Sequence, residues 1–117
     1  QFEDLIVWQE GVKLSCDIYR AFSNSREYAI KDQIIRSSIS IPSNVAEGFE
    51  RQSDKEFVRF LYYAKGSSGE LRTQLYIANQ LCLIDETVCK EAIVRSRRIS
   101  GMIQSLITTI NTDIASK

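Results

Sequence analysis

An unbroken row of apolar and small side chains, spaced alternately by four and three residues, runs from Phe57 to Cys82. Residues at this spacing lie on one face of an α-helix, because the helix has about 3.6 residues per turn. The row continues for more than three heptads, so it predicts one long helix with a face turned to a core. Its members are Phe57, Leu61, Ala64, Ser68, Leu71, Leu75, Ala78 and Cys82.

Three further segments have the same helical period. The first contains Leu5, Trp8, Val12, Ser15, Tyr19 and Phe22. The second extends from about residue 27 to residue 50 and contains Ile30, Ile34, Ile41, Val45 and Phe49. The last contains Val88, Ala92, Ile99, Ile103, Leu106 and Ile110. The chain therefore predicts four helices.

Signals at the ends of these segments support the division. Ser53-Asp54-Lys55-Glu56 has the form of a capping box, and Asp85 is the expected cap of the last helix. Pro42 lies within the second segment. Two shorter helices that meet there are an alternative, but the apolar stripe keeps its phase across Pro42, which favours one kinked helix.

The whole pattern predicts an all-α, antiparallel up-down-up-down four-helix bundle, because short connections join antiparallel neighbours. The chain has 117 residues, one Pro and five Gly, with 44% hydrophobic and 26% charged residues. That length and composition are typical of one soluble domain, which we expect to span residues 1–117. No window resembles a membrane span, so no membrane partner is expected. Since Met102 is the only methionine, we expect the translated chain to begin upstream of Gln1.

Several function classes lose support from composition alone. The chain has no histidine, and its 15 basic residues balance its 15 acidic ones. No catalytic residue, cofactor site or metal site is therefore predicted. Cys16, Cys82 and Cys89 are too few and too scattered for a disulfide framework. We expect buried, reduced thiols in a cytoplasmic protein.

Small polar side chains form a row beside the apolar stripe of the second segment. Hydroxyl and amide groups of this kind suit a close contact with another helix, so we interpret them as a packed polar seam that takes part in assembly. Ser67 and Glu70 lie in a second row of the third helix and belong to the same seam. The predicted seam residues are Gln33, Ser40, Asn44, Glu47, Ser67 and Glu70.

The third helix carries more apolar circumference than one subunit can cover. Such a surplus marks a partner surface, and we assign it to an oligomer contact made by Phe60, Tyr62, Tyr63 and Tyr76. Gly66 and Gly69 lie in the interior of the same helix, where each costs about 1 kcal/mol relative to Ala. They allow another backbone to approach closely, or they mark a local kink.

Motifs along nearly the whole chain resemble one bacterial family. They are Phe2-Glu3-x-Leu5 with Trp8-Gln9, then Gln33-x-x-Arg36, then Ser40-Ile41-Pro42-Ser43-Asn44-Val45-Ala46-Glu47-Gly48, then Phe57-x-x-Phe60-Leu61 with Ala64-x-Gly66-Ser67-x-x-Glu70-Leu71. The family is the four-helix-bundle proteins named for reading frames inside intervening sequences of large-subunit ribosomal RNA genes. The resemblance implies homopentameric rings and no known enzymatic activity. A related protein, the accessory variability protein of diversity-generating retroelements, is strongly basic, binds RNA and partners a reverse transcriptase, whereas this chain is neutral.

Two function hypotheses follow. The first is a non-catalytic, self-associating scaffold of the bacterial cytoplasm, with RNA or an RNA-binding protein as a further partner. Arg95, Arg97 and Arg98 are the candidate nucleic-acid contacts. The alternative is a small hydrolase or ligand-binding enzyme that uses Glu47 and Glu70. Solvent access separates the two, since a catalytic pair lines an open cleft and a structural pair is buried and hydrogen-bonded.

Overall fold

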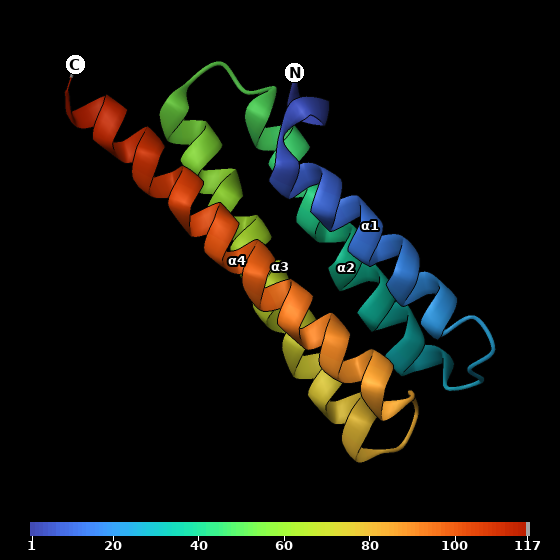
Figure 1. Cartoon of the computed structure of the whole chain (residues 1–117). Helices are drawn as coiled ribbons and strands as arrows, with labels where there is room; N and C mark the ends of the chain where they lie inside the picture. Colours follow the sequence, from blue (N-terminus) through green and yellow to red (C-terminus); the bar gives the residue numbers. More distant parts are fainter. Residues whose placement is uncertain (117) are drawn as a thin grey trace.

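A computed structural model describes residues 1–116 of the chain. A short 3-10 turn, η1 (Phe2–Asp4), precedes four helices: α1 (Ile6–Ala21), α2 (Tyr28–Phe49), α3 (Asp54–Gln80) and α4 (Glu86–Ala115). They form a rod of 51 × 21 × 20 Å, and no strand occurs within residues 1–116 (Figure 1). The predicted all-α four-helix fold is confirmed.

The helices follow one another around the bundle. Each of α1 and α3 packs on both α2 and α4. Figure 1 shows the chain reversing direction at each of the three connections. Two side-chain hydrogen bonds show the relative direction of α2 and α3. Ser37 bonds to Glu70, and Ser40 bonds to Ser67. Residue numbers rise along one helix as they fall along the other, so these helices are antiparallel.

Side-chain caps begin α3 and α4 as predicted. The hydroxyl of Ser53 accepts the backbone N–H of Glu56 at 3.2 Å, and the carboxylate of Asp85 accepts that of Val88 at 3.1 Å. Each cap satisfies one of the backbone donors that have no partner inside the helix. Pro42 lies inside one continuous helix, which confirms the preference for a single α2 over two shorter helices.

Most of the predicted core of α3 is buried, namely Leu61, Ala64, Ser68, Leu71, Leu75 and Ala78. Phe57, at the start of the row, is partly buried against this core, whereas Cys82, at its end, is not part of it. Cys82 is exposed, and its φ of 57° lies in the left-handed region. The backbone N–H of Leu83 bonds to the carbonyl of Ala78 and that of Cys82 to the carbonyl of Asn79, which is the Schellman pattern of a helix end. The helix stops before the apolar row does, so the prediction of a buried Cys82 was wrong.

The buried face of α1 also differs from the prediction. Val7, Gly11, Leu14, Ile18 and Phe22 are buried, whereas Tyr19 and Cys16 are exposed. The reason lies in α2, because a Cβ atom on Gly11 would be only 3.3 Å from the side chain of Pro42. This close approach turns the Gly11 side of the helix inward.

The buried residues in the first turns of α4 also differ from the prediction. Val88 is exposed, and the neighbouring Cys89 is buried instead. Its thiol donates a hydrogen bond to the carbonyl of Leu75 at 3.3 Å. Burial raises the pKa of the Cys89 thiol, and the charge of Glu86 adds to that effect. Of the three predicted buried thiols, only Cys89 is buried.

Candidate functional site

The predicted polar seam exists along the outer contact of α2 with α3. The hydroxyl of Ser37 donates to the Glu70 carboxylate at 2.7 Å. One turn further, the hydroxyls of Ser40 and Ser67 lie 2.9 Å apart. The side-chain amide of Asn44 donates to the carbonyl and the hydroxyl of Ser40 at 2.8 and 2.9 Å. These bonds fix the register of the two helices.

The remaining predicted seam residue on this part of α2 is Gln33, which is exposed. It borders a polar hollow of about 230 Å³ together with Arg36, Ser37, Glu70 and Gln74. The Oε1 atom of Gln74 is buried and has no hydrogen-bond partner in the described chain. The hollow therefore extends the seam but leaves part of its hydrogen-bonding capacity unused.

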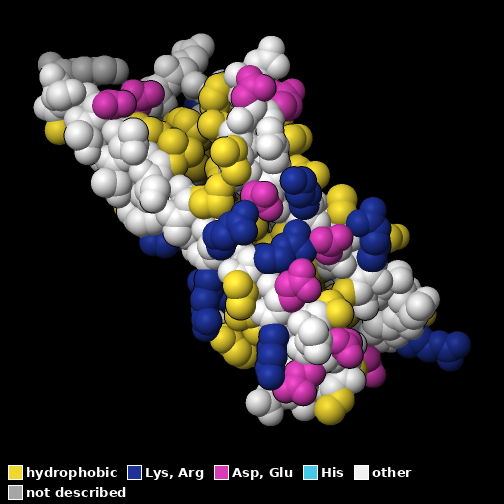
Figure 2. Space-filling view, in the orientation of Figure 1, with side chains coloured by type: hydrophobic (Ala, Val, Ile, Leu, Met, Phe, Trp, Pro, Cys, Tyr) yellow, Lys and Arg dark blue, Asp and Glu magenta, His cyan; other side chains and the backbone are white. Residues whose placement is uncertain are grey.

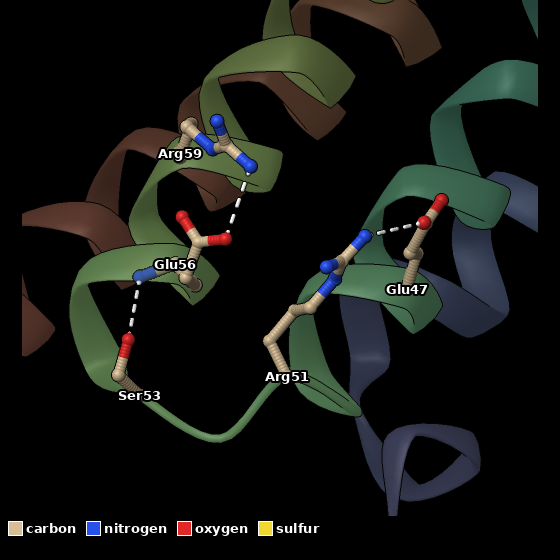
Figure 3. A network of polar contacts seen from close by, with 5 residues as sticks. All are labelled: Glu47, Arg51, Ser53, Glu56 and Arg59. Carbon is tan, nitrogen blue, oxygen red and sulfur yellow. Dashed lines mark hydrogen bonds and ion pairs between the residues drawn. The ribbon is translucent and has the colours of Figure 1, made fainter.

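Glu47 does not join this seam. Its exposed carboxylate forms an ion pair with Arg51 at 2.9 Å, on the same end of the bundle as the Ser53–Glu56–Arg59 contacts (Figure 3). Glu70 bonds to Ser37, which is ten residues, or about 15 Å of helix, away from Glu47. The two carboxylates therefore form neither a catalytic pair nor a buried structural pair.

The oligomer surface predicted on α3 needs one correction. Phe60 is only 7% exposed, so it belongs to the core of the subunit. A Cβ atom built on Gly48 would lie only 2.6 Å from the Cβ atom of Phe60. The guanidinium groups of Arg51 and Arg59 cover its ring at 4.6 and 5.4 Å. The missing side chain at Gly48 thus creates the place that Phe60 fills.

Tyr62, Tyr63 and Tyr76 are 49%, 48% and 47% exposed, so each presents half of its surface to solvent in one subunit. Gly66 and Gly69 lie on the same helix, which is continuous, and neither has a positive φ. A Cβ on Gly66 would have no neighbour within 4 Å. Nothing in the subunit requires glycine there, so of the two earlier explanations the close approach from outside is favoured over a kink.

The three arginines proposed for nucleic acid do not form one patch. Arg95 bonds to Asp17 of α1 at 2.7 Å, and Arg98 lies 3.6 Å from Glu10 of the same helix. Arg97 instead donates to the hydroxyl of Tyr76 on α3 at 2.8 Å. Figure 2 shows basic and acidic side chains interspersed over the face formed by α1 and α4.

The Arg95–Asp17 contact also affects titration. The hydrogen bond from Arg95, with the charges of Arg95 and Arg20, holds the pKa of the Asp17 carboxyl below its ordinary value. Asp17 is therefore a stable anion near neutral pH. It neutralises the guanidinium that the sequence suggested as a phosphate contact.

Residues 1–116 contain no group of three or more His, Cys, Asp or Glu side chains that could hold a metal ion. No helix among them is both long enough and apolar enough to cross a membrane.

Comparisons with known proteins agree with the resemblance. The family model described as 23S rRNA-intervening sequence protein matches residues 3–105. A crystal structure at 1.70 Å resolution of a protein of unknown function from Bacteroides thetaiotaomicron, of the S23 ribosomal protein family, has a TM-score of 0.83 and 22% identity. The match covers 87% of this chain and 98% of that one, and it shows the same fold. A search of curated proteins found no match.

Proposed function

Because the chain belongs to the 23S rRNA-intervening sequence protein family, we propose that it is a non-catalytic, self-associating scaffold that acts with RNA in the bacterial cytoplasm. The observation that carries self-association is the apolar surface of α3. Tyr63, Ile77 and Leu81 each leave about half of their surface in solvent. Burying one large apolar side chain contributes about 1.5 to 3 kcal/mol, so a contact that covers several is favourable.

A second apolar surface lies where α1 meets α2. Tyr19 and Ile39 are more than half exposed there, and they border a hollow of about 290 Å³ together with Cys16. Within the subunit α1 and α3 do not pack on each other. The two surfaces are therefore separate, as a head-to-tail contact requires, and such contacts close into rings when the rotation fits.

We propose that the α3 surface of one subunit covers the α1–α2 surface of the next. The number of five subunits comes from the family resemblance. The polar seam between α2 and α3 adjoins Tyr63 and supplies Glu70 and Gln33 as hydrogen-bonding groups at the edge of this contact.

The RNA part of the proposal is supported by the family description, which refers to an intervening sequence of 23S rRNA. A cytoplasmic location suits that partner. It also suits a chain whose three cysteines are free in the described structure.

Light scattering coupled to size-exclusion chromatography tests self-association. We expect wild-type protein to elute at about five times 13.4 kDa. A Tyr63→Glu/Ile77→Glu variant is expected to lose that mass and keep its helical circular-dichroism spectrum, because both side chains are half exposed. Tyr28→Glu/Val94→Glu is the matched control, since it charges two exposed apolar residues elsewhere. An unchanged mass of the Tyr63→Glu/Ile77→Glu variant would contradict a role of the α3 surface in the subunit contact.

A further inference from the structure

Cationic side chains line the contact of α3 with α4. The ammonium group of Lys65 donates to the side-chain oxygen of Gln104 at 2.7 Å. The guanidinium of Arg72 donates to the hydroxyls of Ser68 and Ser100 at 3.1 and 2.9 Å. All of these acceptors are neutral, so the hydrogen bonds orient the two cations without cancelling their charge.

Arg97 completes the row. Its guanidinium donates to the hydroxyl of Tyr76, which is again a neutral acceptor. Lys65 and Tyr76 are eleven residues apart on α3, so the row extends over about 16 Å. Within residues 1–116 none of the three cations forms an ion pair, in contrast to Arg20, Arg51, Arg59, Lys90, Arg95 and Arg98. This strip is positive although the chain as a whole is neutral.

Aromatic rings accompany the positive strip. Tyr62 and Tyr76 are half exposed. Gly66 and Gly69 lie between them at helical spacing on the outward side of α3. A Cβ on Gly66 would meet nothing within 4 Å, and one on Gly69 would meet only the Arg72 side chain, at 3.8 Å. The helix backbone between the two tyrosines is therefore open to a flat or extended ligand.

We propose that Lys65, Arg72 and Arg97, with Tyr62 and Tyr76, bind a single-stranded segment of RNA. We call these five residues the cationic seam. The proposal rests on the RNA association proposed above and gives it a location. Cations that are not neutralised contact phosphates, and exposed tyrosine rings stack on unpaired bases. A duplex hides its base faces, and an acidic protein segment has no bases to stack, so the rings favour single-stranded RNA.

Fluorescence anisotropy with a labelled oligouridine of about 20 nucleotides, at about 50 mM salt, measures the affinity of the cationic seam for single-stranded RNA. We expect Lys65→Gln/Arg72→Gln/Arg97→Gln to weaken binding at least about tenfold. The control Lys13→Gln/Arg26→Gln/Lys55→Gln removes the same charge from other exposed positions and is expected to stay within about twofold. Since Arg72 bonds inside the α3–α4 contact, the double variant Lys65→Gln/Arg97→Gln provides a second measurement if the triple variant does not fold.

The tyrosines are tested separately. Tyr62→Ala/Tyr76→Ala is expected to lose at least about fivefold in affinity for oligouridine, because base stacking on an aromatic side chain is lost. Its affinity for an RNA duplex of the same length is expected to stay unchanged. An equal loss for both RNAs would contradict single-stranded recognition.

Three results would overturn the proposal: no binding of oligouridine by the wild-type protein, equal losses in the seam and control variants, or equally effective competition by polyglutamate. The last would indicate an acidic protein partner instead. Light scattering in the same buffer separates this inference from self-association. A monomeric wild type that binds RNA through the cationic seam would contradict self-association and support the proposed RNA site. A pentamer that binds RNA elsewhere would support self-association and contradict the proposed RNA site.

Discussion

The guanidinium of Arg95 lies 2.7 Å from the carboxylate of Asp17 and joins α4 to α1 across the bundle. Arg98 and Glu10 make the next contact along the same two helices. As residue numbers rise along α4 they fall along α1, so the two ion pairs record an antiparallel register. Positive charge on α4 here fixes helix position and is not free for an external anion.

The first prediction concerns pH. The pKa of Asp17 is lower in the folded chain than its ordinary value, so its ion pair stabilises the fold above the unfolded-state pKa. That contribution is lost as pH falls through the lower, folded-state pKa. We expect Asp17→Asn to reduce the free energy of unfolding near pH 7 by at most about 1 kcal/mol, because the pair is partly exposed.

Urea denaturation at pH 7 and at about pH 2.5 measures this effect. The difference between wild type and Asp17→Asn is expected to shrink at the lower pH, because the unfolded chain takes up a proton at Asp17 before the folded chain does. Asp113→Asn is the control, since its carboxylate has no ion pair among residues 1–116. A difference that does not change with pH would show that the charge of Asp17 is not the stabilising feature.

The second prediction concerns Gly48 and Phe60. A Cβ at position 48 would lie 2.6 Å from the Cβ of Phe60, so Gly48→Ala forces the two helices apart. We expect a loss of about 1 to 3 kcal/mol in the free energy of unfolding. Gly101→Ala is the matched control, because a Cβ there has no neighbour within 4 Å. It is expected to raise stability by up to about 1 kcal/mol. Equal effects of the two substitutions on the melting temperature would contradict this explanation.

The third prediction concerns the end of α3. Cys82 has a positive φ in a Schellman motif, a position that usually holds Gly. The left-handed conformation costs a residue with a Cβ about 1 to 2 kcal/mol. We expect Cys82→Gly to stabilise the chain by up to about 1 kcal/mol and Cys82→Val to destabilise it, since a β-branched residue fits this conformation least well. Thermal melts check both, and a stability loss with Gly would contradict the assignment.

The fourth prediction concerns thiol reactivity. Cys16 and Cys82 are exposed, whereas Cys89 is buried and its pKa is raised. In dilute native protein we expect fast reaction of Cys82 with a thiol reagent and very slow reaction of Cys89. Cys16 borders the surface that we propose to be covered in the assembly, so its reaction is expected to slow as protein concentration rises. Peptide mass spectrometry of the labelled chain follows each site, and equal rates for Cys82 and Cys89 would contradict the buried position.

Much of the fold follows from local rules in the sequence. The core row of α3 and the caps Ser53 and Asp85 depend on spacing and on side chains within a few residues, and they were predicted. The inward face of α1 was missed because it depends on the fit of Gly11 against Pro42 in another helix. The same holds for Phe60, whose place is created by Gly48. Contacts between distant segments decided both.

The candidate site was also predicted only in part from the sequence. The polar row of α2 identified Ser40 and Asn44 correctly as seam residues, but Glu47 has a partner four residues along its own helix instead. Arg95 and Arg98 were candidate nucleic-acid contacts, and their acidic partners Asp17 and Glu10 lie on α1, too far along the chain to be found from local spacing. Lys65 was not singled out at all. Its neutral partner Gln104 could be found only by placing α4 beside α3.

Native mass spectrometry of the wild-type chain tests self-association by counting the subunits in each species. We expect one dominant species with five copies of the 13.4 kDa subunit at micromolar concentration, because the exposed apolar surfaces of α3 and of α1–α2 cover each other. A discrete species of another size would keep the contact and correct the number taken from the family resemblance. A single-subunit species at every concentration tested would contradict self-association.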